Sequence, residues 1–97
     1  MIPYSFHSEA EREFHEAIDY YENCSRGLGL DFALEVQAAV QSIREHPVAW
    51  PILDDDVRRC MTPRFPYGVL YCIENGAATI LAVMHLHREP DYWKMRL

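Results

Sequence analysis

The chain has 97 residues, 49% of them hydrophobic and 25% charged, with a formal net charge of −6 at pH 7. This length suits one core and leaves nothing for a second domain, and the apolar share argues against an intrinsically disordered chain. The acidic balance argues against a protein whose whole surface binds nucleic acid.

Cysteine usage and hydropathy favour a cytosolic protein. Three cysteines, Cys24, Cys60 and Cys72, stand at scattered spacings without a CxxC pair, which is typical of a reducing compartment. No apolar run is long enough to cross a bilayer, and the first residues lack the basic and apolar regions of a signal peptide. We therefore expect one cytoplasmic domain over residues 1–97 with no membrane contact.

The charges are distributed unevenly along the chain. Residues 8–46 contain nine acids and three arginines, whereas residues 47–97 contain six acids and six bases. The bases of the second half fall into two groups, which are Arg58, Arg59 and Arg64, and Arg88, Lys94 and Arg96. A locally basic face forms on this acidic protein if the fold brings the two groups together.

Residues 2–7 predict a short strand, and a helix is predicted to follow from Ser8. Ser8 stands three residues before Glu11, the spacing of a capping box, in which the two side chains satisfy free amides at a helix start. Apolar side chains then recur at helical spacing, at Ala10, Phe14, Ala17, Ile18 and Tyr21. This pattern predicts a helix that ends near residues 24–27.

Gly27 and Gly29 predict a turn over residues 27–30. A second apolar stripe predicts a second helix, made of Leu30, Phe32 or Ala33, Val36, Val40 and Ile43. Pro47 stops this helix, because the residue before a proline is biased out of the helical region. Two helices with so short a connection form a hairpin.

Residues 47–51 predict an irregular apolar linker, and residues 54–56 predict a polar loop. Three strands are predicted after them, over residues 57–61, 69–73 and 79–85. Asn75-Gly76 between the last two strands is a strong signal for a β-hairpin turn. A short terminal helix is predicted over residues 91–96.

The predicted order of elements is β-α-α-β-β-β, with the helices together and the later strands together. This order predicts an α+β fold in which the helical hairpin packs on one face of a mostly antiparallel sheet. We expect the other face of the sheet to be left for solvent or a partner.

Short motifs are spread over nearly the whole sequence. They are residues 17–22 (AIDYYE), Gly27-Leu28-Gly29 with Phe32 and Glu35-Val36, Pro47 with Trp50-Pro51, Arg58-Arg59, residues 65–67 (FPY), residues 69–71 (VLY), and a close made of residues 80–83, His85, Arg88, Pro90, Tyr92-Trp93 and Arg96. In this order and spacing they resemble the RelE/ParE superfamily of bacterial toxins, which belong to type II toxin–antitoxin systems and include plasmid-stabilisation proteins. The resemblance implies the same β-α-α-β-β-β fold.

The resemblance also implies one of two activities. Members similar to RelE bind in the ribosomal A site and cut mRNA, whereas members similar to ParE lack that catalytic set and poison DNA gyrase. Both kinds are held inactive by an antitoxin segment that wraps the toxin. The implied partners are therefore a cognate antitoxin and either DNA gyrase or the ribosome with its mRNA, in a homodimer or a toxin–antitoxin hetero-oligomer, and no cofactor is implied.

A RelE-like ribonuclease needs a base for the ribose 2′-hydroxyl, cations for the phosphorane and an acid for the leaving oxygen. The resemblance implies that Arg88, Tyr92 and Arg64 would form this catalytic set. Two departures weaken the ribonuclease interpretation: residues 65–68 (FPYG) lack the arginine of RelE-like members, and Lys94 is the only lysine. The ParE-like branch is favoured, and the chain would be an enzyme only if it is RelE-like.

For a ParE-like toxin we expect one surface for the target and one for the antitoxin. The expected target-binding residues are Arg58, Arg59, Arg64, His85, His87, Arg88, Tyr92, Trp93 and Arg96. We expect the antitoxin to place an amphipathic helix and an extended segment on the helical hairpin and an exposed sheet edge, at Phe14, Tyr21, Phe32 and Val36.

Other interpretations of the same residues stay open. Tyr92 and Trp93 could anchor the end of the chain on the core, and Arg88 could pair with an acid of a helix. His85 and His87 could form half of a metal site with a cysteine, but no further ligand spacing supports one, so no metal is predicted. The chain could also be a degenerate, non-toxic interaction module.

Overall fold

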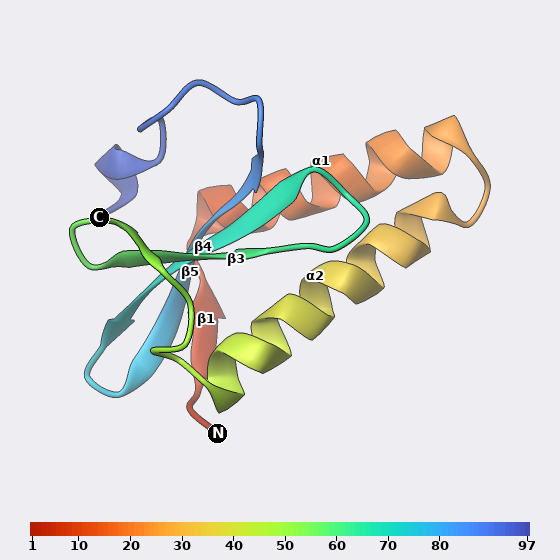
Figure 1. The fold of residues 1–97 in the computed structure, drawn as a ribbon. Helices are drawn as coiled ribbons and strands as arrows, with labels where there is room; N and C mark the ends of the chain where they lie inside the picture. The colour runs from red at the N-terminus through yellow and green to blue at the C-terminus, as the bar shows by residue number, and fades with distance from the viewer.

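Two helices and five strands fold the chain, and a computed structural model describes all of residues 1–97. In chain order the elements are β1 (Tyr4–Phe6), α1 (Ser8–Cys24), α2 (Leu28–Glu45), β2 (Ile52–Asp54), β3 (Val57–Met61), β4 (Tyr67–Glu74) and β5 (Ala77–His85), followed by the short 3-10 helix η1 (Lys94–Arg96). Figure 1 shows the two helices side by side next to the sheet. The predicted α+β fold is confirmed.

The five strands form one sheet in the order β1-β5-β4-β3-β2. All neighbouring strands are antiparallel except β1, which pairs with β5 in parallel. A parallel pair needs a long connection, and here the helical hairpin and three strands lie between the two partners. The turn between β4 and β5 has positive φ at both Asn75 (52°) and Gly76 (76°), so it is the two-residue hairpin turn that was predicted.

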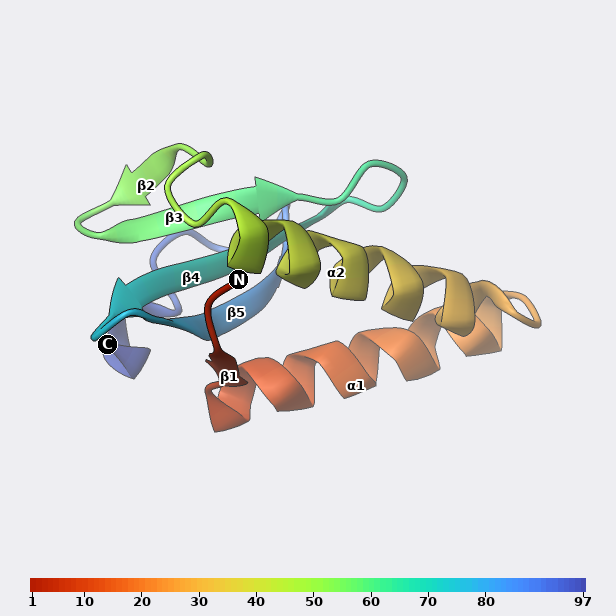
Figure 2. The ribbon, with the colours of Figure 1, turned by 90° about the horizontal axis from the view of Figure 1, so that it is seen from below.

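Both helices cover one face of the sheet, as Figure 2 shows from below. They approach each other closely at Gly29, where a β-carbon would lie 2.6 Å from the Ile18 carbonyl oxygen. Aromatic rings fill the space beneath them: the Phe32 ring centroid lies 4.8 Å from that of Tyr67 and 5.2 Å from that of Phe65. Neither helix is long and apolar enough to cross a membrane.

The face of the sheet away from the helices is partly covered, whereas the sequence led us to expect it to be free. Consecutive residues of β4 alternate between two clusters, with Val69 and Tyr71 on the helix side and Leu70 and Cys72 on the other. Residues after β5 turn back along the sheet (Figure 1), and Trp93, which is 2% exposed, packs into the second cluster. The prediction of a free sheet face is wrong where Trp93 covers the second cluster, because sequence periodicity does not show where a terminal segment folds.

The start of α1 is not the predicted capping box. Ser8 is already helical, and His7 caps the helix, because its Nδ1 accepts a hydrogen bond from the Glu9 amide at 3.1 Å. A histidine nitrogen performs here the role that a serine oxygen usually has. The pattern Ser-x-x-Glu therefore placed the cap one residue too late.

The second helix begins at Leu28, two residues before the predicted stripe. Gly27 precedes it with φ at 87°, and the Glu22 carboxylate accepts hydrogen bonds from the amides of Gly27 and Gly29 at 3.0 and 3.1 Å. A side chain of α1 thus caps α2, and its negative charge suits the positive end of a helix dipole. The predicted turn is correspondingly shorter than residues 27–30.

Four strands follow the hairpin, where three were predicted. The additional strand is β2, which pairs with β3, and its last residue Asp54 was predicted to lie in a loop. The bounds of β3 agree with the prediction, whereas β4 and β5 each extend two residues further towards the N-terminus. Of the predicted terminal helix over residues 91–96, only residues 94–96 are helical.

Candidate binding face at the end of β5

A single carboxylate, Glu13 on α1, joins three parts of the chain. Its side chain is 10% exposed and accepts two hydrogen bonds from the Arg96 guanidinium, at 2.8 and 2.9 Å. It also accepts a hydrogen bond from the Val83 amide of β5 at 3.1 Å. A bidentate ion pair between an arginine and a carboxylate shielded from water is stronger than an ion pair at the surface. Glu13 therefore ties β5 and the C-terminal segment to α1.

Arg88, in the loop after β5, stands beside this network with its side chain 48% exposed. Its Nη1 lies 4.0 Å from the Glu13 carboxylate, and its guanidinium carbon lies 4.0 Å from the centre of the Tyr92 ring. The Arg96 guanidinium carbon lies 5.0 Å from the centre of the same ring. Two cations therefore share one aromatic ring and one carboxylate, which holds Arg88 at the surface.

Tyr92 itself is a support for these arginines. Its hydroxyl is buried and has no hydrogen-bond partner. Burial first, and then the neighbouring Glu13 carboxylate, raise the pKa of Tyr92 above its ordinary value. Tyr92 therefore holds its proton, and the face of its ring contacts the guanidinium groups of Arg88 and Arg96.

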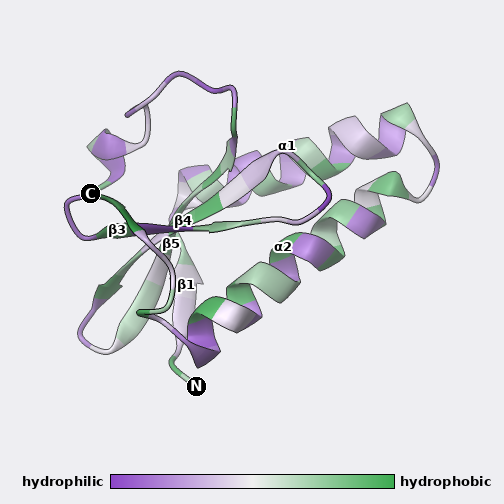
Figure 3. Cartoon of the chain, viewed as in Figure 1, coloured by the Kyte–Doolittle hydropathy of each residue, from purple (hydrophilic) through white to green (hydrophobic).

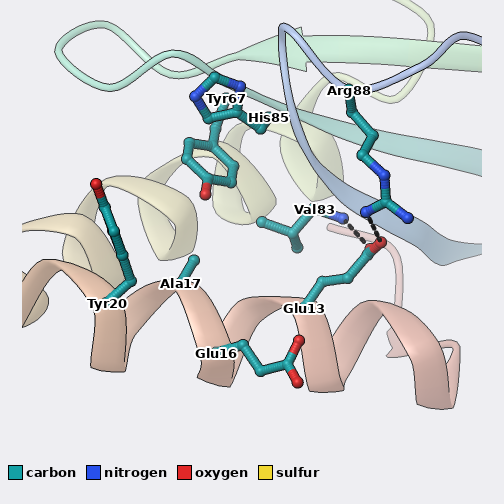
Figure 4. Close-up of a pocket in the computed structure, with 8 residues that line it drawn as sticks. All are labelled: Glu13, Glu16, Ala17, Tyr20, Tyr67, Val83, His85 and Arg88. Atoms are coloured by element: carbon teal, nitrogen blue, oxygen red, sulfur yellow. Dashed lines mark hydrogen bonds and ion pairs between the residues drawn. The ribbon is translucent and has the colours of Figure 1, made fainter.

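A cavity of about 200 Å³ opens between α1 and the end of β5 (Figure 4). We call it the α1–β5 cavity, and its lining residues come from α1, β4, β5 and the following loop: Glu13, Glu16, Ala17, Tyr20, Tyr67, Val83, His85 and Arg88. Burial, and then the negative charge of nearby ionised groups, raise the pKa of Tyr67 to about 12. His85 Nδ1 accepts a hydrogen bond from the His87 amide at 3.0 Å, which leaves Nε2 as the donor of the neutral ring.

A second cavity, of about 220 Å³, lies on the face of the sheet away from the helices and shares Arg88 with the first. We call it the C-terminal cavity, and it is lined by Leu53, Asp54, Arg59, Met84, Leu86, Arg88, Pro90, Asp91 and Trp93. Figure 3 shows hydrophilic colour in β3 and in the loop after β5, the two segments that carry its arginines. The two groups of basic residues noted in the sequence therefore meet here, through Arg59 and Arg88.

Two of the expected target-binding arginines lie elsewhere. The Arg58 guanidinium donates hydrogen bonds to the carbonyl oxygens of Trp50, at 2.6 Å, and Val48, at 3.2 Å. Arg64 pairs with Glu35 on α2, through Nε at 2.5 Å and through its amide at 2.9 Å. Both arginines hold loops in place, and neither lines a cavity at the end of β5.

The remaining expected target-binding residues gather around the end of β5 but differ in exposure. Trp93 is 2% exposed, and the Arg96 side chain is 11% exposed. These two residues therefore lie beneath the surface and support it. Those that reach the surface are Arg59, His85, His87 and Arg88, with the ring of Tyr92 partly exposed.

The expected antitoxin-binding residues also differ in exposure. Phe32 and Val36 are at 0% exposure, so neither offers a contact surface in this structure, whereas Phe14 and Tyr21 are partly buried. A groove of about 120 Å³ nevertheless lies over this part of the hairpin, next to the edge strand β1. We call it the hairpin groove, and it is lined by Tyr4, Phe6, Phe14, Val36, Gln37, Val40, Gln41 and Arg44.

No pattern in the sequence points to the role of Glu13. Glu13 is one of several acids on α1, and its partners Val83 and Arg96 lie 70 and 83 residues further along the chain. Two apolar residues of α2 that the sequence analysis did not expect at the surface, Leu30 (62%) and Leu34 (55%), are exposed. Their spacing of four could have shown that they share one helix face.

No metal centre is assembled at these residues. The His85 and His87 rings lie 5.2 Å apart, but no group of three or more His, Cys, Asp or Glu side chains comes together around them. Cys60 and Cys72 are buried in the two separate clusters, and burial raises the pKa of the Cys60 thiol to about 11. The side chains that the face presents are those of arginine, histidine and tyrosine.

Comparison with known proteins identifies a family and a similar fold. Residues 4–90 match the family described as "ParE toxin of type II toxin-antitoxin system, parDE". A solved structure from P. aeruginosa, titled "Chromosomal ParDE TA system", is similar with a TM-score of 0.76 and 15% sequence identity, over 90% of this chain and 98% of that one. Among curated proteins, none matches the sequence significantly.

Proposed function

Since this chain belongs to the ParE toxin family of type II toxin–antitoxin systems, we propose that it inhibits growth by binding DNA gyrase and is neutralised by a cognate antitoxin. The single observation that carries the binding mechanism is the arrangement at the end of β5. It presents Arg88 against the Tyr92 ring and the Glu13 carboxylate, while the Tyr92 hydroxyl is buried and Arg64 pairs with Glu35 away from this face. The toxin is then active in the cytoplasm, where gyrase and the antitoxin are found.

The positions of the three residues named for a RelE-like ribonuclease support binding over catalysis. Arg64 pairs with Glu35 on α2, whereas Arg88 lies at the end of β5. The Tyr92 hydroxyl is buried, and its pKa is raised, so it is poorly placed to give a proton to a leaving oxygen. A ribosome-dependent cut would need all three groups around one phosphate.

The target side of the proposal is tested with purified gyrase. We expect the chain to inhibit supercoiling and to trap linear DNA, and we expect expression in cells to cause DNA breaks and the SOS response. Arg88→Ala should remove these effects and keep the fold, because the Arg88 guanidinium makes no hydrogen bond within 3.5 Å to Glu13. Arg26→Ala, at an exposed site in the turn between the helices, is the matched control.

Growth arrest with intact DNA and cleaved mRNA would contradict the gyrase proposal in favour of a RelE-like activity. Normal growth during overexpression would contradict both and favour a non-toxic interaction module. The DNA and RNA measurements are made on the same cultures, so that the outcomes are compared directly.

For the antitoxin we propose the surface that runs along α2 into the hairpin groove. Leu30, Leu34, Gln37 and Gln41 follow one another at helical spacing on one face of α2, and the last two line the groove. An amphipathic helix can cover the two exposed leucines, and an extended segment can reach Phe14 beside the free edge of β1. This placement keeps the hairpin proposed from the sequence, with Phe14 and Val36 lining the groove, but leaves out buried Phe32 and adds exposed Leu30 and Leu34.

The antitoxin surface is tested with the protein encoded by a small gene beside this one. Leu34→Ser should weaken the complex by about tenfold or more and lower the melting temperature by only a few degrees, because Leu34 is 55% exposed in the free chain and serine is only a slightly weaker helix former. Val48→Ser is the matched control, since Val48 is 72% exposed in the linker after α2. Equal binding by Leu34→Ser and the parent chain would place the antitoxin elsewhere, and the lack of such a neighbouring gene would count against an antitoxin.

A further inference from the structure

The C-terminal cavity contains an arginine without an anionic partner. The side chain of Arg59 takes part in no hydrogen bond and no ion pair, although it is only partly exposed. Other arginines of the second half of the chain make side-chain hydrogen bonds. Arg58 donates to a main-chain carbonyl oxygen, Arg64 to Glu35 and Arg96 to Glu13. A partly buried guanidinium is costly unless something pairs with it.

The position of Arg59 is fixed by the sheet. Arg59 lies opposite Leu70 in the register of β3 and β4, so its side chain emerges on the face away from the helices. Its stem then crosses Gly68, where an added β-carbon would lie 2.9 Å from Arg59 Cδ and 3.0 Å from Cγ. Gly68 stands where RelE-like members have an arginine. Because it has no side chain, it leaves room for the stem of Arg59 from the neighbouring strand.

Arg88 lines the same cavity and is weakly paired. Its nearest carboxylates are those of Glu89, at 3.6 Å and largely exposed, and Glu13, at 4.0 Å and already bonded to Arg96. The two acids that line the cavity, Asp54 and Asp91, are both paired with Lys94. The cavity thus holds the Arg59 guanidinium, which has no ion pair, and the Arg88 guanidinium, whose two ion pairs are 3.6 and 4.0 Å long.

We propose that the C-terminal cavity binds a carboxylate of a protein partner, namely an aspartate or glutamate side chain that stands next to an apolar residue. The planar guanidinium donates two parallel hydrogen bonds to a carboxylate. If the proposed function holds, on which this assignment of the partner rests, that carboxylate belongs to the toxin's target.

The walls of the cavity favour a peptide over a nucleic acid. Leu53, Leu86, Pro90 and Trp93 line it beside the arginines, and Leu53 is 40% exposed. A volume of about 220 Å³ accommodates side chains, since a water molecule takes about 30 Å³. Nucleic acids bind through many phosphate contacts, which a chain of net charge −6 would oppose.

The site is tested first without any cellular partner, by NMR with the full chain. The probe is the peptide acetyl-Leu-Glu-Leu-amide, and acetyl-Leu-Gln-Leu-amide is its neutral counterpart. We expect the acidic peptide to shift the side-chain Nε–H signals of Arg59 and Arg88 and the indole N–H signal of Trp93, with a dissociation constant of about 1 mM. The neutral peptide should bind about tenfold or more weakly.

Two variants locate the site. Arg59→Gln should abolish the shifts and keep the melting temperature, because the Arg59 guanidinium holds no bond in the folded chain. Gly68→Ala should weaken peptide binding while keeping every charge, because its β-carbon displaces the Arg59 stem. Arg26→Gln removes the same charge from the exposed turn after α1 and should bind the acidic peptide as the parent chain does.

The proposal is overturned if the two peptides shift the same signals equally, if neither does so up to about ten times the expected dissociation constant, or if Arg59→Gln binds as the parent chain does. A single-stranded RNA that shifts these signals, with an affinity that falls steeply with salt, would overturn it in favour of a phosphate site. Peptide binding by a chain that fails to bind gyrase would support the site and contradict the proposed target. Gyrase binding without peptide binding would support the proposed target and contradict the site.

Discussion

At the scale of single residues, Glu13 decides how the end of β5 is presented. Its carboxylate is nearly enclosed and is the common partner of the Val83 amide and the Arg96 guanidinium, with Arg88 close by. A carboxylate taken out of water is stable only if its oxygens are well bonded, as they are here. The rigidity of the binding face therefore depends on one acid of a helix on which most acids are solvated.

We predict that Glu13→Gln destabilises the chain by about 3 kcal/mol, because it leaves Arg96 largely buried without a counter-charge. Urea unfolding followed by circular dichroism measures the change. Glu16→Gln is the control: the Glu16 side chain is 65% exposed and 3.5 Å from Arg12, so its loss should cost less than about 0.5 kcal/mol. Equal costs for the two substitutions would show that Glu13 is an ordinary surface acid.

At the scale of elements, the ends of the helices and of the chain are held by specific contacts. His7 caps α1, Glu22 on α1 caps α2, and the segment after β5 is held through Trp93 and Arg96. Arg96 also donates a hydrogen bond to the Leu81 carbonyl oxygen at 2.9 Å, at the position where the pairing of β4 with β5 shifts by one residue. The bulge therefore supplies an acceptor that anchors the C-terminal segment.

Two substitutions distinguish the observed cap of α1, His7, from the predicted capping-box residue, Ser8. His7→Ala should lower the free energy of unfolding by about 1 kcal/mol, because the Glu9 amide loses its acceptor. Ser8→Ala should change stability much less, since Ser8 is inside the helix. Thermal or urea unfolding measures the stability of both variants. A larger loss of stability for Ser8→Ala than for His7→Ala would show that Ser8 caps the helix.

The second apolar cluster, which contains Leu70 and Met84, should depend on Trp93 of the C-terminal segment. Trp93→Ala should destabilise the chain by about 3–5 kcal/mol and expose Leu70 and Met84, which a hydrophobic dye would detect. Met95→Ala, at a position that is 96% exposed, should leave stability within about 0.5 kcal/mol. Retention of full stability by Trp93→Ala would mean that the segment does not seal the sheet.

At the scale of the whole molecule, charge is divided unevenly between the two halves of the chain. Residues 8–46, which form the hairpin, have a surplus of acids, whereas the bases of the second half meet at the C-terminal cavity. Such a separation orients an approaching partner even when the net charge is −6. The hairpin and the end of β5 are thus chemically distinct surfaces.

Buried phenols make stability depend on pH in alkaline solution. Burial raises the pKa of Tyr67 and of Tyr71 to about 12, so the folded chain keeps protons that the unfolded chain releases near pH 10. We therefore predict that the stability from these groups is complete below about pH 9 and is lost as the pH rises to about 12, by about 2 kcal/mol for Tyr71 alone.

Urea unfolding at increasing pH measures this loss, and Tyr71→Phe provides the comparison. The variant lacks the hydrogen bond that the Tyr71 hydroxyl donates to the Pro47 carbonyl oxygen at 2.7 Å, so it should be less stable at neutral pH. Its stability should then fall less steeply above about pH 10, because the phenol is absent. Parallel curves for the variant and the parent chain would contradict the assignment to Tyr71.

The sequence by itself determined the elements and their order, because the signals that form them are local. Apolar spacing along residues 10–21 and 30–43 and the Asn75-Gly76 turn act over a few residues, and they predicted the hairpin and the β4–β5 pair. Only the tertiary structure decided which apolar residues are exposed and which charges meet. Phe32 is buried while Leu30 is exposed, because burial depends on what packs against a helix. The pairing of Arg96 with Glu13, and the meeting of Arg59 with Arg88 at one cavity, join residues far apart in the chain, and no local pattern records such contacts.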